Sequence, residues 1–118
     1  MNSLDFVNFL FELKAQAHLN HLTTDKYAEH KALGKFYEEW DELSDRFLET
    51  YIGSGARLSG NTFIALDTKA NPVVYLNQAK KFLDNQDLVN GKDLQNIIID
   101  MIELINHTLY LLNLAPGL

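Results

Sequence analysis

Apolar residues recur every three to four positions through most of the chain, a spacing that predicts amphipathic helices rather than strands. Four helices are expected, over about Ser3–Leu22, Tyr27–Tyr51, Val73–Asn85 and Lys92–Asn113. The residues between them fit this division, because Thr23-Thr24-Asp25 are cap and turn formers, Pro72 suits a helix start and Gly91 precedes the last helix. The sequence therefore predicts an all-α fold, a four-helix bundle formed by one domain over residues 1–118.

The second expected helix has the clearest pattern. One apolar ridge is formed by Leu33, Phe36, Trp40, Leu43, Phe47 and Tyr51. An adjoining face carries His30, Gly34, Tyr37, Asp41, Asp45 and Glu49. The ridge is expected in the core, with Tyr37 and Trp40 as packing residues. The adjoining face is expected to meet a partner or a metal.

The fourth expected helix is apolar around most of its circumference, from Leu94 to Leu112. A helix of this kind is usually buried on most sides. Three other short helices cannot surround it fully, so contacts between subunits are expected to cover part of it.

The segment from Ile52 to Pro72 breaks the helical pattern, because it is rich in glycine, serine and asparagine. Connections of this length are uncommon in small domains and suggest a crossover between helix pairs or a role at an interface. Within it, Thr62 to Leu66 is expected to be a short ordered piece that packs on the bundle.

Composition narrows the functional classes. The chain has 118 residues, 47% of them hydrophobic, and no cysteine, which excludes disulfides, zinc–thiolate sites and thiol nucleophiles. It has no signal-peptide pattern and no apolar run that could span a bilayer, so a cytoplasmic protein is expected. A net charge of −6 disfavours binding to nucleic acid or anionic membranes, whereas acidic residues attract cations.

Four residues, His18, His30, Asp45 and Glu49, form a candidate metal-ligand set. Imidazoles combined with carboxylates suit iron or another divalent first-row metal. Asp45 and Glu49 lie one helical turn apart and point the same way. His30 and Asp45, however, are separated by roughly 22 Å along a straight helix, far beyond the reach of one ion. If the four residues form one site, a two-fold related copy of the chain must supply the acids.

These residues stand within a wider similarity. The stretch from Tyr37 to Glu49, the segment His18-Leu19-Asn20, and His30 followed by Leu33 and Tyr37 resemble the corresponding motifs of the Dps family of miniferritins. The similarity is good over residues 10–51, weaker over 92–114 and absent between them.

The resemblance implies a ferritin-like four-helix bundle with a short extra helix in the central connection. It also implies a homodimer formed through the second helix, within a cage of twelve subunits. By position, His18 and His30 would come from one subunit and Asp45 and Glu49 from its neighbour. Iron would be the substrate, and the expected activity is that of a ferroxidase, which oxidises Fe(II) with hydrogen peroxide or oxygen and stores the ferric product.

A second hypothesis belongs to another class, a ferritin-like assembly or interaction protein with a vestigial or single-metal site. It is motivated by Gly34, which stands where the family often has an acid, by Leu19 in place of an aromatic residue, and by the short chain. Asn20 and His21 have two readings, as residues that orient a ligand imidazole or as surface and capping residues.

Overall fold

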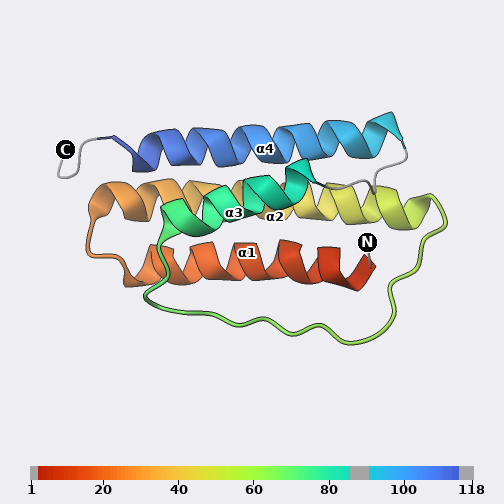
Figure 1. The fold of residues 1–118 in the computed structure, drawn as a ribbon, viewed down its shortest axis with the longest axis horizontal. Helices are drawn as coiled ribbons and strands as arrows, with labels where there is room; N and C mark the ends of the chain where they lie inside the picture. Colours follow the sequence, from red (N-terminus) through yellow and green to blue (C-terminus); the bar gives the residue numbers. More distant parts are fainter. Residues whose placement is uncertain (1–2, 86–90, 115–118) are drawn as a thin grey trace.

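The computed structural model describes residues 3–85 and 91–114, in which four helices pack side by side (Figure 1). They are α1 (Ser3–Thr23), α2 (Tyr27–Gly53), α3 (Pro72–Asp84) and α4 (Lys92–Leu112). All four match the sequence prediction to within two residues at each end. The described part of the chain is thus an all-helical bundle, and α2 is one unbroken helix that carries three of the four candidate ligands.

The helices form a closed circuit of neighbours. α2 packs against α1 and α4, α4 also packs against α3, and α3 meets α1 only lightly. α1 and α2 are antiparallel, while α2 and α3 run in the same direction because a long connection returns along the bundle between them (Figure 1). The expected crossover is therefore present, and the light contact between α1 and α3 leaves room for a cavity.

The core is built from the apolar stripes of all four helices. α2 contributes the predicted ridge, with Leu33, Phe36 and Trp40 fully buried. Trp40 also donates its indole N–H to the carbonyl of Leu10 at 3.0 Å, which ties α2 to α1 inside the core. α4 buries Leu94, Ile97, Ile98, Met101, Leu104, Ile105 and Leu109 within the single chain. One chain therefore covers most of α4 by itself. The side chains that another subunit could still cover are those on its outer side, such as Ile99 and Tyr110, which are exposed.

The expected short helix in the central connection is not formed. Residues 61–70, which we call the strap, contain no helix; they run beside α1 without regular secondary structure as far as Asp67 and then form a turn at residues 68–69. Four polar side chains of α1 hold its backbone, and we call them the polar ladder: Asn8, Glu12, Gln16 and Asn20. The prediction that Thr62 to Leu66 is an ordered piece packed on the bundle agrees with these hydrogen bonds, whereas the short helix that the family resemblance implied for this connection is absent from residues 54–71.

The geometry of the polar ladder explains why the strap is not helical. Asn8, Glu12 and Gln16 accept the N–H groups of every second strap residue, Phe63, Ala65 and Asp67, at 3.0–3.1 Å. Four helical residues advance about 6 Å, and two extended residues advance about 6.6 Å. The two spacings nearly coincide, so successive turns of α1 meet alternate N–H groups of the strap. A helix in the strap would use these N–H groups internally and lose the ladder.

Candidate functional site

Four rings gather where the end of α1 packs against the start of α2, and we call them the ring cluster: His18, His21, His30 and Tyr37. The imidazole of His18 stacks on Tyr37, with ring centroids 4.1 Å apart and planes 13° from parallel. The imidazole of His21 stacks on His30 at 3.8 Å and 15°. His21 also meets Tyr37 edge-on at 5.4 Å, so the four rings are continuous. The fold therefore brings His18 and His30 into one cluster at the same end of the bundle.

Two reciprocal hydrogen bonds fix the orientation of His21 and His30. The Nδ1 of His21 lies 2.6 Å from the carbonyl oxygen of His30, and the Nδ1 of His30 lies 2.7 Å from the carbonyl oxygen of His21. A carbonyl oxygen can only accept, so the geometry assigns the hydrogen to Nδ1 in both rings. In the neutral imidazoles, Nε2 then keeps its lone pair. This is the arrangement that histidine ligands of metals commonly have, with the second ring nitrogen bonded to a carbonyl.

Gly34 is required by this cluster. A Cβ added at Gly34 would lie 2.8 Å from Cε1 and 2.9 Å from Nδ1 of His21, closer than carbon atoms approach without displacement. Gly34 lies in the middle of α2, where glycine is unfavourable for the helix by about 1 kcal/mol relative to alanine. The residue therefore serves the close packing of α1 on α2, which is a physical reason for the absence of an acid at this position.

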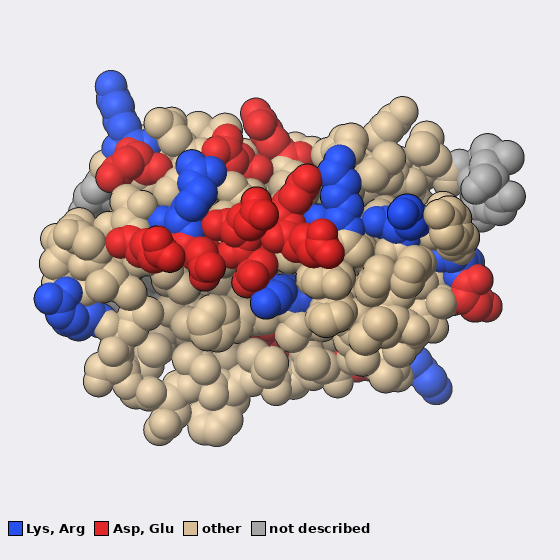
Figure 2. Space-filling model, turned by 180° about the vertical axis from the view of Figure 1, so that it is seen from behind, with Lys and Arg blue, Asp and Glu red and all other residues tan. Residues whose placement is uncertain are grey.

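The two candidate acids lie elsewhere on α2. Asp45 and Glu49 are exposed, and within the described residues neither has a hydrogen-bond or ion-pair partner. Glu38 and Glu42, also exposed on α2, extend the acidic surface, and Figure 2 shows a band of Asp and Glu side chains across one face of the molecule. The part of the face toward α1 is nearly free of charge (Figure 2). One helix thus carries the imidazole of His30 near its start and the carboxylates of Asp45 and Glu49 toward its end.

Within residues 3–85 and 91–114, no three histidine or acidic side chains of one chain are placed so that they could share a metal ion. His30 and Asp45 lie on the same unbroken helix, so the separation of roughly 22 Å expected from their spacing applies. The structure brings two of the candidate ligands together, His18 and His30, and leaves the other two, Asp45 and Glu49, apart from them. A single described chain does not assemble the four-residue site.

The structure shows the contacts of Asn20 and His21, for which the sequence left two roles open. Asn20 donates its amide to the strap carbonyls of Thr68 and Ala70, at 3.4 and 3.3 Å, so it holds the strap instead of orienting an imidazole. The backbone carbonyl of His21 accepts the Nδ1 hydrogen of His30, so His21 orients this imidazole through its main chain. Sequence reasoning did not identify the other members of the polar ladder, although their spacing of four residues along α1 was a visible signal.

The bundle and its ring cluster define the class of protein as an all-helical, four-helix domain with a histidine-rich helix–helix contact. A family model described as "Family of unknown function (DUF5856)" matches residues 21–112, and the chain belongs to this family. The matched region contains His30, Asp45 and Glu49 and begins after His18. No curated protein and no solved structure matches the chain. In the described residues, none of the helices is long and apolar enough to cross a membrane.

Proposed function

We propose that two copies of this chain bind iron, or another divalent first-row metal, between the imidazole end of one copy and the acidic end of the other, and that they oxidise Fe(II) there. His18 and His30 of one copy and Asp45 and Glu49 of the second copy are the proposed ligands. The single observation that carries the proposal is the separation of the ligand types along the bundle. The half-buried rings of His18 and His30, held by stacking on Tyr37 and by a hydrogen bond to a carbonyl, lie where α1 packs on the start of α2. The carboxylates of Asp45 and Glu49 lie toward the end of α2 without partners among the described residues.

The orientation of His30 supports the proposal. Its Nδ1 hydrogen is donated to a backbone carbonyl, so the ring is held and Nε2 has its lone pair free in the neutral form. The ring of His18 is held by stacking on Tyr37. Orienting the imidazoles in advance reduces the entropy that a ligand loses when a metal binds.

A two-fold arrangement of α2 against α2 supplies the missing acids. Two-fold interfaces pair residue i with j and residue j with i, so an antiparallel contact between two α2 helices brings each imidazole end to an acidic end. The exposed apolar side chains of Phe11, Leu22 and Tyr27 lie on α1 and at the start of α2, where such a contact would cover them. Asp41, another acid of α2, is not among the proposed ligands; within one copy it forms an ion pair with Lys14 of α1 at 3.1 Å.

The reaction requires two electrons from two Fe(II) ions. With hydrogen peroxide, the O–O bond breaks, each oxygen receives one electron and one proton, and two waters leave with two Fe(III) produced. With dioxygen the first two electrons give peroxide. Imidazoles and carboxylates suit this substrate, because carboxylates favour Fe(III) more strongly than Fe(II) and the product is thereby stabilised.

Mixing two inactive variants tests the split site directly. His30→Ala and Asp45→Ala should each lose rapid Fe(II) oxidation, measured by absorbance after addition of iron and peroxide. When the two variants are co-refolded, half of the dimers are mixed and each contains one intact site of two. About a quarter of wild-type activity should therefore return. Glu42→Ala, which removes another exposed acid of α2, is the matched control and should keep full activity. Absence of recovery, or equal activity in wild-type and His30→Ala protein, would contradict the proposal.

A second candidate function is that of an assembly or interaction protein without iron chemistry. The observation that favours it is the reciprocal stacking within the ring cluster, which by itself explains why these histidines are present, as a clasp between α1 and α2. Metal analysis together with the mass in solution by light scattering distinguishes the two functions. An oligomer that neither contains nor oxidises iron would favour the second.

A further inference from the structure

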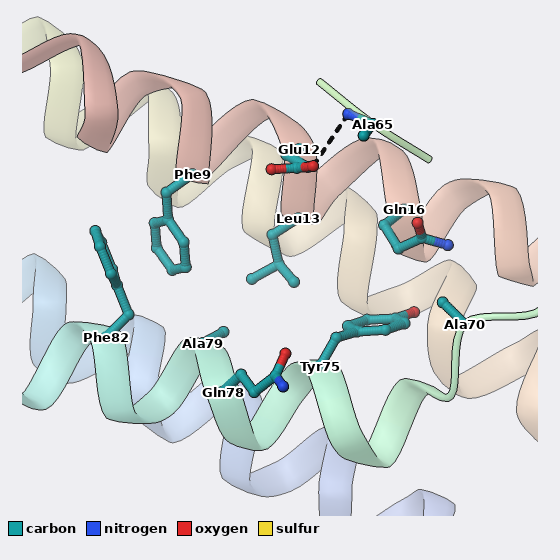
Figure 3. Close-up of a pocket in the computed structure, with 10 residues that line it drawn as sticks. All are labelled: Phe9, Glu12, Leu13, Gln16, Ala65, Ala70, Tyr75, Gln78, Ala79 and Phe82. Atoms are coloured by element: carbon teal, nitrogen blue, oxygen red, sulfur yellow. Dashed lines mark hydrogen bonds between the residues drawn. The ribbon is translucent and has the colours of Figure 1, made fainter. Parts of the chain in front are cut away.

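A cavity of about 390 Å³ lies between α1, α3 and the strap, at the place where α1 and α3 meet only lightly (Figure 3). This volume is in the range of sites that hold small molecules. The ring cluster does not line it, so the cavity is separate from the proposed iron site.

One end of the cavity is apolar. Phe9 of α1 and Phe82 of α3 meet there with ring centroids 4.2 Å apart, and Leu13 and Ala79 continue the apolar wall (Figure 3). Aromatic and aliphatic walls of this kind favour the flat or apolar body of a ligand over water.

The other end contains an unpaired hydroxyl. Tyr75 of α3 extends along the cavity with its hydroxyl on the side of Gln16 and Ala70 (Figure 3). This oxygen is buried and has no hydrogen-bond partner among the described residues. A buried hydroxyl without a partner is costly, so a hydrogen-bonding group brought by a ligand would be favoured there.

The neighbouring polar side chains, Gln16 and Glu12, are bonded to other groups, so this hydroxyl remains available to a ligand. Gln16 donates to Asn20 and to the carbonyl of Asp67, at 2.7 and 2.8 Å, and accepts the N–H of Asp67 at 3.0 Å. Glu12 accepts the N–H of Ala65 at 3.1 Å, as drawn in Figure 3. Both side chains serve the strap, and neither is bonded to Tyr75.

Charge limits the ligand further. The carboxylate of Glu12 lines the cavity, and among residues 3–85 and 91–114 no lysine or arginine does. Burial, together with the negative charge of Glu29, raises the pKa of the Tyr75 phenol above its ordinary value. The phenol therefore stays neutral, and its hydroxyl can either donate its proton to a ligand or accept an N–H or O–H of a ligand on its oxygen. An anionic ligand would meet the carboxylate of Glu12 with no compensating cation among the described lining residues.

We propose that this cavity binds a neutral, mainly aromatic or apolar small molecule whose one hydrogen-bonding group pairs with the hydroxyl of Tyr75. The apolar body occupies the end formed by Phe9 and Phe82, and the polar group lies beside Gln16. Ala65 and Ala70, at the strap, form part of the wall, so the polar ladder also keeps the cavity in shape.

Two dyes of nearly equal shape test the proposal by fluorescence titration of the full chain. N-phenyl-1-naphthylamine is neutral, and 8-anilinonaphthalene-1-sulfonate has the same ring system with a sulfonate added. The neutral dye should bind one per chain with saturation, and the sulfonate should bind at least about tenfold more weakly. That difference corresponds to about 1.4 kcal/mol.

Two substitutions assign the binding to this cavity. Ala79→Leu fills the apolar wall and should weaken binding of the neutral dye by tenfold or more, whereas Val74→Leu on the exposed side of α3 should leave it unchanged. Tyr75→Phe retains the ring and loses the hydroxyl, and it should weaken binding about fivefold while the helical circular dichroism stays intact. If the neutral dye shows no saturable binding, or if Ala79→Leu and Tyr75→Phe both bind it as wild-type protein does, the proposal is wrong.

Discussion

Replacement of Gly34 by alanine should destabilise the protein, although alanine is the better helix former. In an undisturbed helix interior, the change would stabilise by about 1 kcal/mol. Here the new Cβ would lie 2.8 Å from Cε1 of His21, and the ring must move. Movement breaks the hydrogen bond from its Nδ1 to the carbonyl of His30, about 1 kcal/mol, and the stacking on that residue, about another 1 kcal/mol. The net effect is a decrease of about 1 kcal/mol in the free energy of unfolding.

The sign should reverse when the obstructing ring is removed. In a His21→Ala background no imidazole meets the new Cβ, so Gly34→Ala should raise the free energy of unfolding by about 1 kcal/mol. The two backgrounds differ by about 2 kcal/mol, which is the coupling free energy between the two positions. Urea unfolding followed by circular dichroism, at one protein concentration for all variants, measures it.

Gly53→Ala provides a control at the end of the same helix, because nothing lies within 4 Å of a Cβ added there. Its effect should be the same with and without His21. If Gly34→Ala stabilised the wild-type protein as much as it stabilised the His21→Ala variant, the packing of His21 against Gly34 would be refuted.

Three further predictions concern hydroxyls and the strap. Tyr75→Phe should stabilise the ligand-free protein by about 1 kcal/mol, since the hydroxyl is buried without a partner. The raised pKa of the folded phenol means that the unfolded chain ionises first, so wild-type stability should fall as pH rises above about 10, and the variant should fall less in pH-dependent urea unfolding. Ser44→Ala should also stabilise by about 1 kcal/mol in urea, because its buried Oγ is unpaired in the described structure; unchanged or lower stability would contradict this. Gln16→Leu should speed trypsin cleavage after Lys69, within the strap, roughly tenfold while cleavage after Arg57, outside the strap, keeps its rate; equal acceleration at both sites would refute local release.

The positions of the four helices followed from the hydrophobic period, because each helix buries one continuous stripe. The buried ridge of Leu33, Phe36, Trp40 and Phe47 is the clearest case. The strap could not be predicted in the same way. Its conformation depends on hydrogen bonds to residues about fifty positions earlier, such as the bond from Asp67 to Gln16, and a local pattern carries no information on that pairing.

The candidate site was predictable only in part. That His18 and His30 share one end of the bundle follows from a short turn between two antiparallel helices. The partnership of His21 with His30 did not follow, because it depends on the rotation of α1 about its axis and on the room that Gly34 leaves. Gly34 stands where the family that the sequence resembles often has an acid, and the sequence indicated only that a ligand was missing there. The structure shows that a glycine is required at this position by the packing of His21.

The ring cluster stabilises the helix contact and orients an imidazole with the same hydrogen bonds, so loss of iron oxidation in a His21 variant would not separate the two roles. The mixing experiment does separate them. Co-refolded His30→Ala and Asp45→Ala chains can recover activity only if ligands from two copies meet, and a clasp confined to one chain offers no means of recovery. The coupling between Gly34 and His21, in contrast, depends on one chain alone and should be measured whether or not iron binds. A protein with the coupling and without recovery would have the histidine clasp as a structural element of the bundle, and the interaction function would then be favoured.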